Sequence, residues 1–435
     1  MNESGIGLLE PGTGEQPEDF RFPENKETKQ VSETGAPLDE FNFYQDRFQG
    51  MTERHNERSA EKGFSGVMKR LVDKKLLEND KPSRPDKVSK EYVIQEMAER
   101  ENKDFDRRLD KERREWDEKL APVIESLKLK RDDPENEGKK RKVLIFALGG
   151  GLRGPYGAGQ VIALNEMGIT ADKVDVLVGA SAGMADLVYY AGGPEQTYIG
   201  SSIYYDECTT KEFLDVSRVT HVMDARVAAK SMRSGEKAID QDAIRRIPTE
   251  VYALVTPINE PNAKLVDIKS AKPDMIAPIE ASMNVRLIRA PGTEVNGEQA
   301  EDGSFGSFEI QQLIDKFHPT DILVLPNIPF RKMAEFKKST SLLEYIPNAG
   351  SPGTIKKFLS VAKELRSMLQ EARDKQGVNI GVLWPPDVGL DTLDGDADLI
   401  KYGTVEAARD AIRQFGEQQP EKIDLYIPEK FRRKN

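Results

Sequence analysis

The chain has 435 residues, and 64 Lys+Arg against 75 Asp+Glu give a net charge of -11, which excludes a generally basic surface for nucleic acid. With 37% hydrophobic and 32% charged residues, it is too polar for one uniformly packed domain. Its single cysteine, Cys208, excludes an internal disulfide framework, and three histidines leave no histidine metal cluster, so we expect no metal site.

The start of the chain, Met1–Ser4, lacks the basic residues and the apolar run of a signal peptide. No apolar stretch approaches the roughly 18 residues of a membrane span. We therefore expect a cytoplasmic protein, without a nucleic-acid partner, that contacts membranes only at their surface. The sequence leaves its oligomeric state open.

Residues 1–62 are rich in Glu, Pro, Gly, Asn and Gln and poor in aliphatic residues. Such a segment cannot bury enough apolar area to offset its chain entropy, so we predict a disordered acidic tail. Within the tail, a group of aromatic residues fits two interpretations equally well. It could dock on a partner or on the main domain, or it could be an apolar patch in a tail that stays unfolded. It comprises Phe41, Phe43, Tyr44 and Phe48.

Residues 63–138 are predicted to form a charged helical extension that ends in a linker. Apolar residues between Phe64 and Leu76 recur at helical spacing with Lys and Arg between them, which predicts a short helix with a basic face. Packing of this helix against the protein is favoured over an anionic membrane surface. A second helix is predicted from Val88 to Leu129, solvated or stalk-like, and bent or restarted at Pro122.

From residue 139 to residue 435 the pattern changes to short apolar runs that alternate with helical segments. The predicted strands are Val143–Leu148, Val174–Val178, Val251–Val255, Ile322–Leu325 and Ile380–Leu383. The predicted helices are Gly157–Met167, Ala182–Tyr190, Ile355–Ala372 and Thr404–Phe415. Because continuous apolar runs suit strands that are buried on both faces, the pattern predicts a three-layer α/β/α domain with a mainly parallel sheet.

A first glycine-rich turn follows the strand that ends at Leu148. Gly149, Gly150 and Gly151 allow a sharp backbone turn that presents bare N–H groups at a helix start, which suits a phosphate or an oxyanion. The turn also fits G-x-G-x-x-G, so a dinucleotide-binding fold is an alternative. That fold requires an acidic residue at the far end of the second strand, where this chain runs into Gly179 instead.

A second turn, from Gly179 to Gly183, has the form G-x-S-x-G between a predicted strand and a predicted helix. This is the context of a nucleophile elbow, in which small neighbours let a tight turn lift the Ser181 hydroxyl above the sheet. Ser181 lies 32 residues after Gly149, which fits one strand–helix–strand unit. Adjacent parallel strands would therefore bring both turns to the same sheet edge.

The base that would deprotonate Ser181 is less evident. His221 and His318 are available, but neither lies in an informative setting, and both are expected to be structural or surface residues. Asp302 is more promising, because it follows a hairpin signal at Asn296-Gly297 and precedes a glycine, Gly303, that lets the chain turn away.

Taken together, Gly149–Gly154, Gly179–Gly183 and Asp302-Gly303 resemble the patatin-like phospholipase family, whose motifs G-G-G-x-R-G, G-x-S-x-G and D-G-G/A occur in this order. The resemblance covers about Lys142 to Phe415 and includes the late segment Leu399–Gly403 with the helix after it. It implies a patatin-like domain, a Ser–Asp dyad that acts on lipid acyl esters, and no cofactor.

By this resemblance, Ser181 is the nucleophile, Asp302 is the base, and backbone N–H groups around Gly150, Gly151 and Leu152 hold the oxyanion. Arg153 is expected to shape the turn through a salt bridge rather than to take part in the chemistry. The residues that support the motifs are Gly149, Arg153, Gly154, Gly179, Gly183 and Gly303.

The chain departs from the family pattern in three places. Ser304 stands at the third position of D-G-G/A, and Phe308 and Ile310 stand where many members have Asn and Pro. The proline-rich approach to the aspartate is replaced around 284–286. At these positions the resemblance is weakest as a guide to the substrate pocket and, to a lesser degree, to the placement of Asp302.

The sequence thus predicts a serine acyl-ester hydrolase with a lipid or phospholipid substrate and transient contact with a membrane surface. An acyltransferase of related fold is an alternative, since an alcohol or thiol can also capture an acyl-enzyme. A catalytically silent interaction protein with this fold is another. A dinucleotide-binding protein is the weakest alternative.

Overall fold

A computed structural model describes residues 90–215, 223–285, 291–335, 367–368, 371, 377–393 and 395–418, with side chains from residue 103 onward. Its helices are α3 (Lys90–Asp132), α4 (Pro155–Glu166), α5 (Ala182–Ala191), α6 (Pro194–Asp206), α7 (Ala225–Arg233), α8 (Gln241–Arg246), α9 (Ile276–Met283), α10 (Ile310–Phe317), α11 (Phe330–Glu335) and α13 (Ala397–Gln414). Its strands are β1 (Val143–Ala147), β2 (Val176–Ala180), β3 (Glu250–Pro257), β4 (Lys264–Asp267), β5 (Thr293–Val295), β6 (Glu298–Asp302), β7 (Asp321–Leu325) and β8 (Asn379–Val382).

The described strands form one mixed sheet in the order β5-β6-β3-β2-β1-β7-β8, with β4 also paired to β3. The strands β3, β2, β1, β7 and β8 are parallel, so their carboxyl ends meet at one edge. The strands β4 and β6 run antiparallel to β3, and β5 runs antiparallel to β6. The prediction of a mainly parallel sheet is therefore confirmed, with an antiparallel margin that the apolar runs did not indicate.

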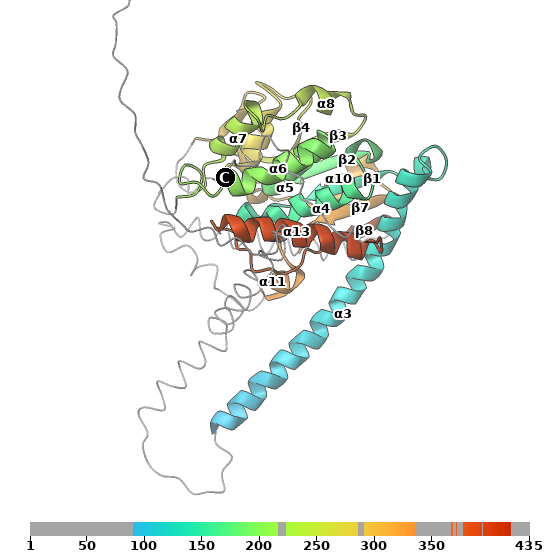
Figure 1. Cartoon of the computed structure of the whole chain (residues 1–435), viewed down its shortest axis with the longest axis vertical. Helices are drawn as coiled ribbons and strands as arrows, with labels where there is room; N and C mark the ends of the chain where they lie inside the picture. Colours follow the sequence, from blue (N-terminus) through green and yellow to red (C-terminus); the bar gives the residue numbers. More distant parts are fainter. Residues whose placement is uncertain are drawn as a thin grey trace, which may run out of the picture. The chain divides into compact units, whose positions relative to one another are not determined.

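Helices cover both faces of the sheet, which makes the predicted three-layer arrangement (Figure 1). Alternate residues of β1 divide between two cores: Ile145 packs with α4, α5, α9 and α13, whereas Leu144 and Phe146 pack with α10 and α11. This division follows from the strand geometry, since successive side chains point to opposite faces. Apolar residues on both faces of the strand explain why β1 reads as a continuous hydrophobic run.

Helix α3 closes the β8 edge of the sheet (Figure 1). Trp116 belongs to the core on one face, whereas Leu120, Val123 and Leu127 belong to the core on the other face. A Cβ atom at Gly381 of β8 would lie 2.8 Å from Leu120 Cα, so helix and strand approach closely. The expected solvated helix is therefore corrected for its C-terminal half, which is part of the sheet's core. Covering an edge strand in this way also shields its outer backbone groups from pairing with another chain.

The predicted strands and helices that lie within the described residues are met, most of them within a few residues, although α13 begins at Ala397, before the expected Thr404. The five predicted strands correspond to β1, β2, β3, β7 and β8, and the helices at 157–167, 182–190 and 404–415 correspond to α4, α5 and α13. Helix α3 continues through Pro122 without a restart. The aromatic group, the helix at 64–76 and most of the helix at 355–372 lie outside the described residues. Among the described helices, none combines the length and the apolar character that crossing a bilayer requires.

Candidate active site

Ser181 stands between the end of β2 and the start of α5, as the elbow motif predicts. Its backbone has a positive φ, with φ 51° and ψ -128°, and the residue is 7% exposed. A serine in this conformation is strained, and such strain clusters at functional sites. The flanking glycines permit the turn: a Cβ atom at Gly179 would lie 2.5 Å from Met184 Cα, and one at Gly183 would lie 2.6 Å from the carbonyl carbon of Ala147.

Asp302 is the last residue of β6 and is 2% exposed. Its carboxylate accepts a hydrogen bond of 2.8 Å from the N–H of Ser304, and its own N–H donates to the carbonyl oxygen of Asn284 at 3.1 Å. Gly303 allows the turn that follows, because a Cβ atom there would lie 2.3 Å from the carbonyl oxygen of Leu254.

Strand register brings Ser181 and Asp302 to the same end of the sheet, at the carboxyl ends of the parallel strands. Ala180, just before Ser181, pairs with Leu254 of β3, and Asp302 pairs with the next residue of that strand, Val255. The two residues thus flank one strand, and neighbouring strands lie about 4.8 Å apart, so their backbones are about 10 Å apart. Side chains that lean toward each other bridge this separation.

The Ser181 side chain hydrogen-bonds to Asp302, and the surroundings of the Asp302 carboxyl group shift its pKa. Burial raises the pKa of Asp302 to about 6, while hydrogen bonding from Ser181 and from Ser304 limits the rise. The neighbouring charge of Glu301 raises it further. The pKa of Asp302 thus lies closer to neutrality than that of an ordinary carboxyl group, which favours service as a general base.

The first glycine turn lies beside Ser181, as the spacing predicts. A Cβ atom at Gly149 would lie 2.9 Å from Ser181 Cβ and 3.0 Å from Ser304 Oγ. The N–H groups of Gly150 and Gly151 donate to no acceptor among the described residues, whereas the Leu152 N–H donates to the carbonyl oxygen of Thr392 at 3.0 Å. Of the three expected oxyanion donors, the Leu152 N–H is therefore already used in a hydrogen bond within the chain.

Arg153 and Gly154 shape the turn. The half-buried Arg153 donates through Nε to the carbonyl oxygen of Gly150 at 3.4 Å. Burial lowers the pKa of its guanidinium, while Asp391 and Asp387 act in the opposite direction. The expected salt bridge is therefore not found among the described residues, where the side chain bonds to the turn's own backbone and the two carboxylates act only at longer range. At Gly154 any side chain would meet the Tyr204 ring.

Of the chain's three histidines, only His318 lies within the described residues, and it is remote from this site. His318 is exposed and ends α10 in a left-handed conformation with φ 48°. It precedes β7, so it lies at the amino end of the parallel strands, opposite the edge that carries Ser181. His221 lies outside the described residues. Among the described residues, no group of His, Cys, Asp or Glu side chains could hold a metal ion.

Three residues that the sequence did not single out also contact the site. Ala182, the first residue of α5, has an N–H with no acceptor among the described residues, and in elbows of this kind the residue after the serine donates to the oxyanion. Asn327 binds the glycine turn, donating to the Leu148 carbonyl oxygen at 2.8 Å and accepting from the Gly157 N–H at 2.7 Å. Ser282 of α9 accepts a hydrogen bond from the Ser181 N–H.

Of these three residues, only Ala182 carried a sequence signal, because it belongs to the elbow motif itself. Asn327 lies 179 residues after Leu148 in the chain, and Ser282 lies 101 residues after Ser181. No local pattern links positions so far apart, so the folded structure is needed to find them.

Comparison with known proteins adds little to this geometry. No protein-family model matches the chain, and no curated protein matches it. Among solved structures, VipD from Legionella pneumophila is similar with a TM-score of 0.33 and 13% identity, over 63% of this chain and 67% of that chain. A similarity of this size carries no argument about activity, so the function must be inferred from the chain's own residues.

Proposed function

We propose that the chain is a serine acyl-ester hydrolase of the patatin-like type, with Ser181 as nucleophile and Asp302 as base. One observation carries the proposal: a serine in a strained strand–helix turn interacts with a buried carboxyl group whose pKa is raised to about 6. A structural serine needs neither the strain nor the buried partner. Both features are typical of an activated nucleophile.

In the proposed reaction, Ser181 Oγ attacks the ester carbonyl carbon while its proton passes to the Asp302 carboxylate. The tetrahedral intermediate collapses, the alcohol leaves with the proton from Asp302, and the acyl group remains on Ser181. Water then attacks the acyl-enzyme with Asp302 again as base, and the free acid departs. Neither step requires an imidazole.

The oxyanion that forms in each step needs hydrogen-bond donors beside Ser181. We assign this role to the N–H groups of Gly150, Gly151 and Ala182, and we omit Leu152 because Thr392 already accepts its N–H. Loss of one such donor typically costs about 3 kcal/mol in the barrier. Gly149 contributes by leaving room between the donors and Ser181.

The proposed substrate is a lipid or phospholipid acyl ester, which follows from the resemblance in motifs rather than from the pocket. Such a substrate implies transient contact with a membrane surface. The basic face predicted at 64–76 suits this contact, and that segment lies outside the described residues.

The test compares the wild type with Ser181→Ala on a p-nitrophenyl ester. We expect hydrolysis to fall to background with an unchanged melting temperature, because the alanine keeps the turn and removes only the hydroxyl. Ser202→Ala is the matched control, since Ser202 is also buried and donates to the Ile199 carbonyl oxygen within α6. Equal activity of the wild type and Ser181→Ala would end the proposal.

The alternatives give different outcomes. An acyltransferase would form an ester or thioester when an alcohol or thiol acceptor is added, which product analysis detects. A catalytically silent protein would leave Ser181 unlabelled by a fluorophosphonate ester. A dinucleotide-binding protein would respond to a cofactor titration, although the elbow occupies the position at the end of β2 where that fold needs an acidic residue.

A further inference from the structure

Resting on the proposed function, we propose that Ser282 is a positioning residue that fixes the Ser181 turn and ties it to the strand beside Asp302. Ser282 belongs to α9, and its side chain is fully buried. It lies outside the three motifs on which the resemblance depends.

Two hydrogen bonds of Ser282 define this role. Its Oγ accepts a hydrogen bond of 2.8 Å from the Ser181 N–H and donates one of 2.8 Å to the carbonyl oxygen of Leu254. Leu254 pairs with Ala180 in the sheet, just before Ser181. One hydroxyl group thus holds the strained residue and the strand that separates it from Asp302.

The same turn of α9 also contacts Asp302. The carbonyl oxygen of Asn284, two residues after Ser282, accepts the Asp302 N–H at 3.1 Å. The two members of the proposed dyad are therefore held by residues two positions apart in the chain. A shift of this segment would alter the distance between the Ser181 hydroxyl and the Asp302 carboxylate, and small misplacements are costly in catalysis.

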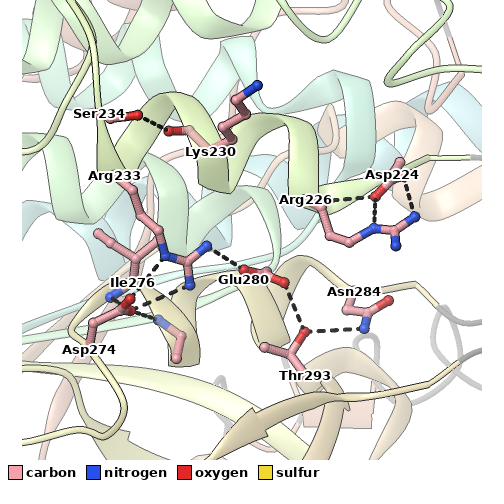
Figure 2. Close-up of polar contacts among 11 residues, drawn as sticks. Asp224, Arg226, Lys230, Arg233, Ser234, Asp274, Ile276, Glu280, Asn284 and Thr293 are labelled. Carbon is pink, nitrogen blue, oxygen red and sulfur yellow. Dashed lines mark hydrogen bonds and ion pairs between the residues drawn. The ribbon is translucent and has the colours of Figure 1, made fainter. Parts of the chain in front are cut away.

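Helix α9 is itself anchored from outside (Figure 2). Arg233 of α7 binds Glu280 at 2.6 Å and Asp274 at 3.0 Å, as Figure 2 shows. Thr293 of β5 donates to Glu280 at 3.4 Å and accepts from the Asn284 side chain at 3.3 Å. These contacts tie α9 to both α7 and β5, so Ser282 lies on a restrained element.

Replacement by alanine removes both bonds at once. The Ser181 N–H and the Leu254 carbonyl would lose their shared partner inside the protein, where water cannot readily replace it. The strained φ of Ser181 then has less support, so the serine relaxes away from Asp302. Hydrogen bonding from Ser181 limits the rise in the pKa of Asp302, so weakening that bond raises this pKa further, in the direction that Glu301 also favours.

The experiment measures kcat, KM and the pH dependence of p-nitrophenyl ester hydrolysis for the wild type, Ser282→Ala, Ser282→Thr and Ser202→Ala. We expect kcat of Ser282→Ala to fall by about 10- to 100-fold with little change in KM. The acid limb of its kcat/KM profile should move to higher pH. Ser282→Thr keeps the hydroxyl and should restore both properties, and Ser202→Ala should match the wild type.

Several outcomes would overturn the role of Ser282. Wild-type kcat and an unmoved acid limb in Ser282→Ala would do so, as would equal losses in Ser282→Ala and Ser202→Ala. A fall in kcat that Ser282→Thr does not restore, with no shift of the acid limb, would indicate a merely structural serine. If Ser282→Ala does not fold, Ser282→Cys, which keeps the size but donates weakly, is measured in its place against the same outcomes.

Failure of the underlying function would look different. In that case the wild type and Ser181→Ala would hydrolyse the ester equally, whatever residue stands at position 282. Loss of activity in Ser181→Ala together with wild-type behaviour of Ser282→Ala would keep the proposed function and remove only this inference.

Discussion

The two sides of the candidate site are held by different kinds of contact. On the side of Ser181, parallel strands and glycines bring backbone atoms into close approach, as at Gly183 against Ala147. On the side of Asp302, an antiparallel strand is held by pairing with β3 and by the carbonyl oxygen of Asn284, the residue just after α9. The Ser181 side depends mainly on glycines that let backbone atoms of neighbouring segments come close, with Ser282 as a further partner. The Asp302 side depends mainly on strand pairing and on the backbone just after α9.

Among the variants that test this contrast, the largest effect is expected on the antiparallel side, at Asp302. Asp302→Asn should lower kcat/KM by about 10²- to 10⁴-fold, because an amide cannot take the Ser181 proton. The amide oxygen can still accept the hydrogen bond that Ser304 donates to the carboxylate, so the fold should persist. Steady-state kinetics on a p-nitrophenyl ester measure the loss.

Stability provides the control for Asp302→Asn. Burial raises the pKa of Asp302 above its unfolded value, so the folded state binds this proton more tightly. The contribution of Asp302 to stability is therefore greatest at low pH and declines as the pH rises toward about 6. At pH 8 the asparagine variant should be at least as stable as the wild type in thermal unfolding. A large loss of stability there would mean that Asp302 serves the fold rather than the chemistry.

The parallel side is tested by Gly183→Ala. The new Cβ would lie 2.6 Å from the carbonyl carbon of Ala147 and 2.7 Å from the carbonyl oxygen of Leu148, and backbone atoms cannot move aside cheaply. We expect about 1–3 kcal/mol of lost stability, measured by thermal unfolding, together with reduced activity.

Gly395→Ala is the matched control for the parallel side. A Cβ at Gly395 would meet only the Leu214 side chain, at 3.6 Å, which is an ordinary contact. This variant should unfold close to the wild-type temperature. Equal losses in both variants would contradict the account of close approach.

The same contrast explains how much the sequence could predict. Gly179, Ser181 and Gly183 are a local pattern with a local cause, so the elbow could be placed from residue types alone. Asp302 was identified from a hairpin signal and a family pattern, but its burial and its contact with Ser181 depend on the β3–β6 register. The pairing of Leu152 with Thr392 could not be predicted, because nothing near either residue indicates it.

Helix α3 shows the same limit outside the site. Its sequence is dominated by charge, and its apolar residues are sparse, which predicted a solvated helix. Trp116, Leu120 and Leu127 are nevertheless buried, because the helix meets the sheet edge at β8. A sparse apolar stripe was sufficient for packing once a partner strand with a glycine, Gly381, allowed close contact.

A smaller effect is expected from pH. Since Asp302 must be ionised to act as the base and its pKa is about 6, kcat/KM should fall below that pH. At pH 5 it should be about tenfold below its plateau. A profile that is flat down to pH 4, with the protein still folded, would contradict the role of this carboxylate as the base.

The smallest effect is expected at the hairpin turn between β5 and β6, at the opposite end of β6 from Asp302. Gly297 has φ 86°, and a Cβ there would meet nothing within 4 Å, so Gly297→Ala adds backbone strain without a clash. We expect about 1 kcal/mol of lost stability, with activity within about twofold of the wild type. Gly297→Asn should recover part of the loss, because asparagine tolerates left-handed backbone, as Asn296 does at φ 53°. A large loss of activity in either variant would mean that the turn, and not α9 and β3, sets the position of Asp302.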